Sequence, residues 1–302
     1  MDAFVALLLS KLHELRVFHL GPNFCKDLAL TGMMLRFALC AGPAGSLNLS
    51  RFYRLEELSC QNDTYPGIKN PVRTTYTILP FFYLLGIRKV KADIENPITI
   101  FTWPSHLPDP SNLTILDLRD VRELFLTNLL AVTKGLRSLR WDWYSMKSVA
   151  RSGDPVYESP IIDLDQFATA VLQVRHTLNE LIISGTTDAP GDRDQPEVYI
   201  HGSLQALVGL DELRTLEAPM PFLTGTFSIA DGTTHNLDRV LARNIERLRL
   251  RCDFYSERNE WEEEVVLRFV ESWLDSGNWK QVTRHLRSLS LPTKERPERG
   301  RS

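Results

Sequence analysis

Residues 113–144 read LTILDLRDVRELFLTNLLAVTKGLRSLRWDWY, and this stretch decides the fold. It contains one motif twice, Leu-x-x-Leu-x-apolar, at residues 113–118 and again at residues 136–141. Side chains of a strand alternate between its two faces, so the last two apolar positions of each motif share one face. Because a single strand of this kind cannot cover its apolar face, the two copies are expected to stack in parallel and bury a shared core.

Between the two motifs the apolar spacing becomes that of a helix. Asp120 and Glu123 have the spacing of a capping box, which predicts that a helix begins directly after Asp120. Asp163 and Gln166 predict a second helix start by the same rule, and residues 262–274 combine an acidic start with helical apolar spacing. Strand and helix therefore alternate along the chain, which is typical of α/β folds with parallel sheets.

The motif recurs along the whole chain in nine candidate copies. They occupy residues 15–20, 55–60, 87–92, 113–118, 136–141, 178–183, 213–218, 245–250 and 286–291. From the second copy onward, successive motifs are 23 to 42 residues apart, whereas a leucine-rich repeat takes about 20 to 29 residues, so several copies carry insertions. We therefore predict an α/β fold in the form of an irregular leucine-rich-repeat solenoid, a horseshoe-like arc with parallel strands on its concave face and helices on its convex face.

The repeat array sets the expected domain organisation. It is predicted to fill residues 1–292 as a single domain, followed by a disordered basic tail over residues 293–302. Two polar segments rich in Gly, Pro, Ser and Asp, residues 145–160 and 184–197, are predicted to be exposed loops.

Composition argues against several classes of function. Leucine accounts for 46 of the 302 residues, and 35 Lys and Arg residues face 38 Asp and Glu residues, for a formal net charge of -3. Neither nucleic acid nor an acidic membrane is expected as a partner, because this balance provides no overall basic field. No apolar run approaches the roughly 18 residues of a membrane span, the four cysteines form no Cys-x-x-Cys pair, and no basic segment precedes the apolar start of the chain. We expect an intracellular protein, cytoplasmic or nuclear.

Several stretches resemble the filamentous-fungal F-box/leucine-rich-repeat-like proteins, and the likeness covers about residues 10–290. They are SNLTILDLRDV (111–121), LLAVTKGLRSLRWDWY (129–144), IDLDQFATAVLQVRHTLNELIIS (162–184), GSLQALVGLDELRTLEAPMPFLTG (202–225) and RNIERLRL (243–250). The resemblance implies the substrate-recognition part of an F-box-type ubiquitin-ligase adaptor. The family usually carries an F-box module ahead of the repeats, with a Leu-Pro-x-Glu opening that docks the adaptor. That opening does not occur in this chain, which is therefore expected to lack the F-box and to begin inside the repeat array.

The start of the chain is apolar, with Phe4, Leu7, Leu8 and Leu12 close together. A terminal repeat needs a polar cap, because otherwise its apolar side is exposed to water. We therefore expect the chain to be poorly soluble or to depend on a partner.

No recognised catalytic constellation occurs in the sequence. The patterns Gly-x-x-x-x-Gly-Lys-Ser/Thr, Gly-x-Gly-x-x-Gly and Gly-x-Ser-x-Gly are all missing. Asp163 and Asp165 would suit a metal or acid–base site, but their position at a predicted helix start favours capping. Two hypotheses remain: a non-catalytic scaffold that binds a protein partner, with no cofactor, metal or small-molecule substrate, and an α/β enzyme whose site these motifs do not reveal. The nine motif copies favour the scaffold.

If the motif leucines face inward, the residues between them line the open face of the sheet. The resulting binding candidates are Lys89, Lys91, Asp117, Arg119, Arg140, Asp142, Glu217, Arg247, Arg249 and Arg251. Arg247, Arg249 and Arg251 share one strand, which predicts a basic patch for an acidic segment of a protein partner. The alternative is a solvated face whose charges only prevent sheets from stacking. Trp141 and Trp143 fall on inward positions and are predicted to be core residues.

Overall fold

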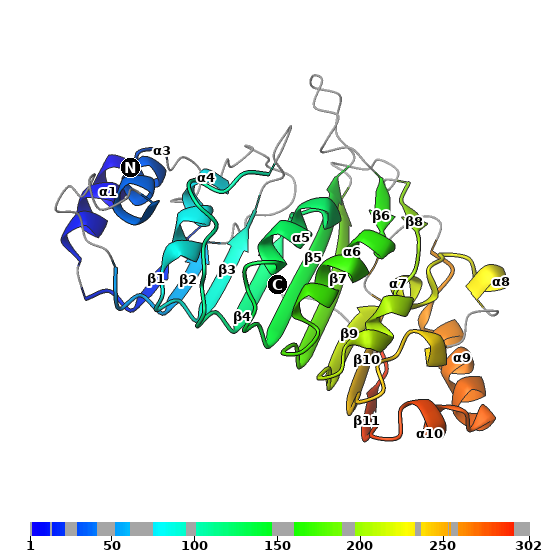
Figure 1. Cartoon of the computed structure of the whole chain (residues 1–302). Helices are drawn as coiled ribbons and strands as arrows, with labels where there is room; N and C mark the ends of the chain where they lie inside the picture. The colour runs from blue at the N-terminus through cyan, green and yellow to red at the C-terminus, as the bar shows by residue number, and fades with distance from the viewer. Residues whose placement is uncertain are drawn as a thin grey trace, which may run out of the picture.

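The computed structural model describes residues 2–12, 14–21, 29–40, 52–60, 75–94, 101–146, 160–188, 197–232, 237–252, 254 and 259–292. Within these residues nine parallel strands form one large sheet, and their order across the sheet is their order along the chain (Figure 1). The strands are β1 (Val17–His19), β2 (Glu57–Cys60), β3 (Lys89–Asp93), β4 (Ile115–Arg119), β5 (Ser138–Met146), β7 (Glu180–Asp188), β9 (Thr215–Pro219), β10 (Arg247–Arg251) and β11 (Ser288–Ser290). A second, two-stranded parallel sheet consists of β6 (Ile161–Asp163) and β8 (Tyr199–His201).

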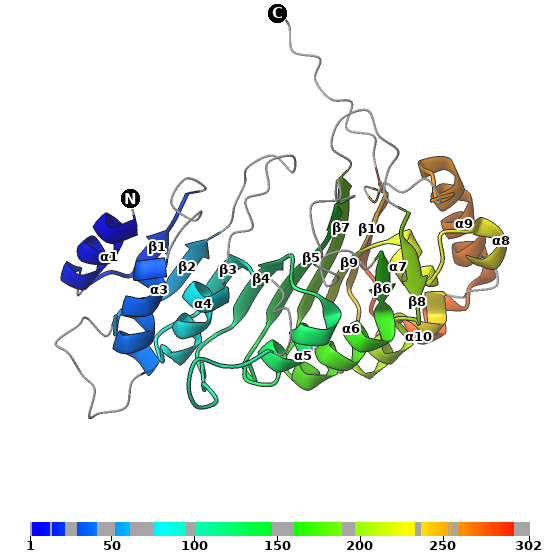
Figure 2. The same ribbon diagram turned by 90° about the horizontal axis from the view of Figure 1, so that it is seen from above.

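Helices follow most strands, and α4 to α7 lie along one face of the large sheet (Figure 2). The helices are α1 (Asp2–Lys11), α3 (Ala29–Leu35), α4 (Thr75–Ile78), α5 (Glu123–Leu130), α6 (Leu164–Val171), α7 (Met220–Thr224), α8 (Ile229–Gly232), α9 (Glu263–Ser276) and α10 (Trp279–Val282). Shorter helical turns are η1 (Arg36–Cys40), η3 (Leu79–Tyr83), η4 (Leu172–Val174), η5 (Gln205–Gly209) and η6 (Leu237–Arg239). The predicted α/β class is therefore confirmed. In the ranges given above, no helix has the length and apolar character needed to cross a membrane.

Each of the nine motifs overlaps one strand of the large sheet, so the predicted strand positions are confirmed. The central leucines of five successive strands are register partners: Leu116, Leu139, Leu181, Leu216 and Leu248. Each is at most 1% exposed. This ladder of buried leucines packs the five strands together, and its burial stabilises the sheet.

Trp141 and Trp143 are fully buried, which confirms that they are core residues. The Trp141 ring stacks on Phe167 of α6, with ring centroids 4.3 Å apart. Its indole N–H donates to the Val121 carbonyl oxygen at 2.9 Å. Trp141 therefore joins the strand layer to the helix layer and satisfies its own polar group while doing so.

One of the two predicted capping boxes is present. Asp163 accepts hydrogen bonds from the backbone N–H of Gln166 at 2.9 Å and from its side-chain amide at 2.8 Å, at the start of α6. The box predicted at Asp120 is wrong: α5 begins at Glu123, its N-cap is Arg122, and no side chain caps it. Asp120 instead has φ of 69° at the end of β4, a left-handed conformation that Asp tolerates better than most residues and that turns the chain.

The two predicted loops begin later than expected, because β5 and β7 remain paired as far as Met146 and Asp188. In the second loop, Gly185 contributes to the composition that predicted a loop but lies within β7. A Cβ at this position would lie 2.4 Å from the ring of Phe254 and 3.1 Å from that of Phe222, so the glycine makes room for aromatic packing. Residues 147–159, residues 189–196 and the predicted tail 293–302 lie outside the described residues.

Candidate functional site

The ten predicted binding residues lie on β3, β4, β5, β9 and β10, at positions that alternate with the buried ladder. The register aligns Lys91 with Asp117 and Asp117 with Arg140, and it aligns Glu217 with Arg249. Their side chains therefore share the face of the sheet opposite the core. We call this surface the open face.

Two ion pairs join neighbouring strands on the amino-terminal side of the open face. Lys89 Nζ lies 3.5 Å from Glu57 Oε2, and Lys91 Nζ lies 4.0 Å from Asp117 Oδ2. The lysine side chains are 43% and 38% exposed, so solvent screens both pairs and each stabilises the fold little.

A polar network joins β3, β4, β5 and β7 toward their carboxyl ends. Arg119 Nε donates to Asp142 Oδ2 at 3.1 Å, and the Ser184 hydroxyl donates to Asp142 Oδ1 at 3.1 Å. Burial lowers the pKa of Arg119, but the nearby carboxylates of Asp93 and Asp142 outweigh it and raise the pKa above its ordinary value. Arg119 and Asp142 therefore satisfy each other within the sheet and offer a partner little free charge.

Glu217 of β9 forms ion pairs with two arginines of β10. Its Oε1 lies 2.5 Å from Nη1 of Arg251, and its Oε2 lies 3.6 Å from Nη1 of Arg249. The Arg251 side chain is 23% exposed, whereas that of Arg249 is 65% exposed. The predicted basic patch is therefore divided: Glu217 neutralises Arg251 within the sheet, and Arg249 keeps most of its surface in solvent.

Two other arginines of the open face have no carboxylate partner among the described residues. Arg140 is exposed on β5 between two register neighbours, Asp117 on β4 and the uncharged Ile182 on β7, and no ion pair joins it to Asp117. Arg247 is exposed on β10, and its Nε donates to the Thr215 hydroxyl at 3.1 Å. Arg140, Arg247 and Arg249 are therefore the positive charges that the predicted residues leave available to a partner.

A hollow of about 360 Å³ lies at the amino ends of β4, β5, β7, β9 and β10. In five motifs, the residues between the first two apolar positions line this hollow. They are Thr114, Ile115, Arg137, Ser138, Asn179, Glu180, Arg214, Thr215 and Arg247. We call this surface the amino-edge hollow. Arg137 and Arg214 were missed in the sequence, because both stand at the second motif position, which strict alternation assigns to the leucine side and not to the open face. That shared position is the signal that would have found them.

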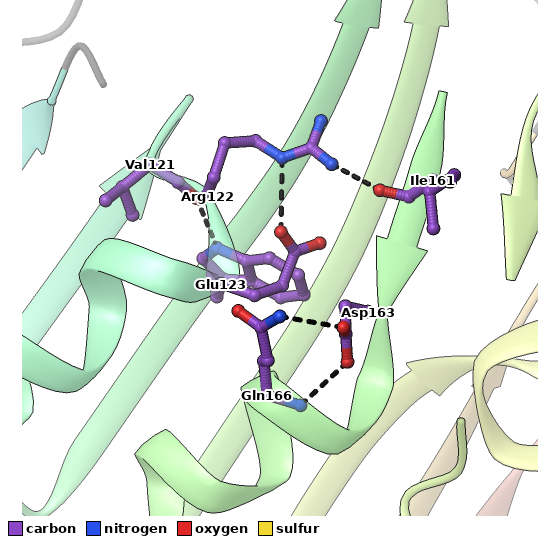
Figure 3. Close-up of polar contacts among 7 residues, drawn as sticks. Val121, Arg122, Glu123, Ile161, Asp163 and Gln166 are labelled. Carbon is purple, nitrogen blue, oxygen red and sulfur yellow. Dashed lines mark hydrogen bonds and ion pairs between the residues drawn. The ribbon is translucent and has the colours of Figure 1, made fainter. Parts of the chain in front are cut away.

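A buried acid lies at the N-terminus of α5 (Figure 3). Glu123 is 4% exposed; its Oε2 accepts a hydrogen bond from Arg122 Nε at 3.1 Å, and its Oε1 has no partner in the described part of the chain. Arg122 also donates to the Ile161 carbonyl oxygen, and its guanidinium lies 5.0 Å from the centre of a Trp143 ring. Burial raises the pKa of Glu123, and the charge of Arg122 lowers it by less. This cluster attaches α5 to β6 beneath the surface.

Asp163 and Asp165 bind backbone groups. Asp163 caps α6, and Asp165 Oδ1 accepts a hydrogen bond from the backbone N–H of Ser203 at 2.9 Å. Gly202 has φ of 79°, and a Cβ there would lie 2.4 Å from the carboxyl carbon of Asp165, so glycine is required for this contact. The capping interpretation of Asp163 is confirmed, and no group of three metal-ligating side chains occurs within the described ranges.

A comparison of the chain with models of known protein families finds no match, and a comparison with curated proteins finds none. The function is therefore inferred from the geometry of the chain.

Proposed function

We propose that the chain is a non-catalytic protein-binding scaffold, built as a leucine-rich-repeat solenoid, whose open face holds a protein partner. The strand order supports this architecture, since every strand of the large sheet lies beside the next one along the chain. A doubly wound nucleotide-binding sheet instead reverses its strand order near the middle and carries helices on both faces. A repeat array adds each unit beside the last and leaves an extended surface for binding.

The observation that carries the proposal is the set of available charges on the open face. Arg140, Arg247 and Arg249 are exposed, whereas the carboxylates of Asp142 and Glu217 already have donors. An acidic segment of a partner would pair with Arg140 and Arg247 without breaking an ion pair within the sheet, and with Arg249 in competition with its 3.6 Å ion pair to Glu217. Charge complementarity of this kind sets the association rate and the choice of partner more than the total affinity.

The resemblance to F-box/leucine-rich-repeat-like proteins extends the proposal. It makes the partner a substrate protein that is brought to a ubiquitin ligase. This extension rests on the resemblance alone, and the identity of the captured partner tests it: a partner whose ubiquitination does not change when the chain is deleted would contradict the extension and leave the scaffold intact.

Capture from a cell extract with quantitative mass spectrometry tests the scaffold. The face variant combines Arg247→Glu with Arg249→Glu, and it leaves Arg251 unchanged because that residue is paired with Glu217. The control combines Arg268→Glu with Lys280→Glu, which are exposed residues on α9 and α10 and give the same change in charge.

We expect the wild type and the control to recover the same partner and the face variant to recover about tenfold less of it, since charge-assisted hydrogen bonds are lost. Thermal unfolding of all three proteins checks that each is folded. Equal recovery by the three folded proteins would contradict the proposal.

A further inference from the structure

The amino-edge hollow extends across five neighbouring strands. The residues at the third motif position of these strands are register partners and form one row across the hollow: Ile115, Ser138, Glu180, Thr215 and Arg247. Neighbouring strands lie about 4.8 Å apart, so the row is about 19 Å long. An extended peptide advances about 3.4 Å per residue, and about six residues of such a peptide would span the row.

The charges in the hollow are arranged in an alternating order. Arg137 on the β5 side is exposed, and its side chain has no hydrogen-bond or ion-pair partner among the described residues. Glu180 follows on β7, where it accepts a hydrogen bond from the Ser138 hydroxyl at 2.6 Å. Arg214 and Arg247 follow. Arg214 Nη1 lies 3.2 Å from Glu246 Oε1, so Arg214 has a carboxylate partner and Arg247 has none in the described part of the chain. Two positive positions, Arg137 and Arg247, thus flank one negative position.

This order selects among anions. A guanidinium binds a carboxylate through two parallel hydrogen bonds, so each arginine suits one acidic side chain. Arg137 directly precedes β5, Arg247 lies on β10, and these two strands are about 14 Å apart. A single small anion would therefore contact only one of the two arginines, and Glu180 between them would repel it. Two carboxylates about four residues apart on an extended chain match this distance, and residues i and i+4 of such a chain project from the same face.

We propose that the amino-edge hollow binds an extended acidic segment of the protein partner, with one carboxylate at Arg137 and a second, four residues later, at Arg247. The residue midway between them faces Glu180 and is a hydrogen-bond donor, and an apolar residue two positions before the first acid contacts Ile115, which is 40% exposed. The proposal rests on the protein-binding function above and defines the partner's sequence as apolar-x-acid-x-donor-x-acid.

Synthetic peptides test this specificity by isothermal titration calorimetry on the whole chain. The probe is acetyl-Leu-Ala-Glu-Ala-Ser-Ala-Glu-Ala-amide. One control peptide has Gln in place of both Glu residues, a second has the two Glu residues adjacent, and inorganic phosphate serves as the small anion. Arg137→Gln is compared with Arg88→Gln, an exposed arginine at the same motif position on the strand next to the hollow.

We expect the probe to bind about tenfold more tightly than either control peptide or phosphate, and Arg137→Gln, unlike Arg88→Gln, to remove most of this advantage. Failure of the probe to bind at millimolar concentration, equal affinity for the Gln peptide or phosphate, or equal binding by the Arg137→Gln protein would overturn the proposal. Capture of a partner that depends on Arg247 and Arg249 but not on Arg137 would overturn the hollow as its site and leave the scaffold function intact. Binding of the peptide without capture of any partner would support the hollow as a peptide site and contradict the scaffold function.

Discussion

At the N-terminus of α5, the Glu123 carboxyl is buried, and its raised pKa makes stability depend on pH. The ordinary pKa of this carboxyl is 4.5, and the folded value lies above it. Between the two values the folded state binds more protons than the unfolded state, so the free energy of unfolding decreases as pH rises through this window. Below pH 4.5 both states are protonated and the stabilisation is fully present.

Glu123→Gln removes this dependence, because the amide has the same shape and does not ionise. We expect the free energy of unfolding of the variant, minus that of the wild type, to increase with pH across the window. One titrating group limits the slope to about 1.4 kcal/mol per pH unit. Denaturant titrations of both proteins at a series of pH values measure it. Parallel stability curves would show that Glu123 does not titrate differently in the folded chain.

At the scale of the strand, β7 offers a direct comparison of its two faces. Leu181 is fully buried in the leucine ladder, while its neighbour Ile182 lies on the open face and is half-buried. Leu181→Ala should cost about 2 to 5 kcal/mol of unfolding free energy, since it removes apolar contacts and leaves a cavity beneath β7. Ile182→Ala is the matched control and should cost clearly less. Equal costs, measured by denaturant unfolding, would remove the support for stacked equivalent units.

At the scale of the whole molecule, an apolar surface lies at the end formed by α1 and α3 (Figure 1). Asp2 joins the two helices by accepting hydrogen bonds from Leu30 and Thr31 backbone N–H groups at 2.7 and 3.0 Å. Phe4, Leu7 and Met33 are 62%, 61% and 54% exposed, and α1 is apolar on its exposed and its buried sides. A helix that is apolar all round is normally covered, and a contiguous patch of this kind favours association.

We therefore expect the purified chain to associate as its concentration increases. Leu7→Lys combined with Met33→Lys should reduce this association, whereas Leu124→Lys, a lone exposed leucine on α5, should not. Sedimentation velocity over a range of concentrations measures the effect. A wild-type chain that stays monomeric throughout, or that behaves like the double variant, would contradict the expectation.

The sequence alone determined the positions of the strands and the core. Leu139 and Trp141 alternate within one strand, and Asp163 and Gln166 cap a helix across three residues. Such patterns depend on side chains that are close in the chain, so periods of two and 3.6 residues are sufficient to predict them. The same local rule failed at Asp120, where a left-handed turn replaced the expected cap.

The tertiary structure alone decided which charges are free. Glu217 pairs with Arg251, which lies 34 residues further along the chain. Arg137 and Arg247 line the same hollow only because the strands between them align in register. Burial of Glu123 likewise requires β6 to pack beside α5. Motif spacings vary between 23 and 42 residues, so no local pattern specifies these neighbours. Strand alignment does, because it decides which side chains lie about 5 Å apart and which remain in water.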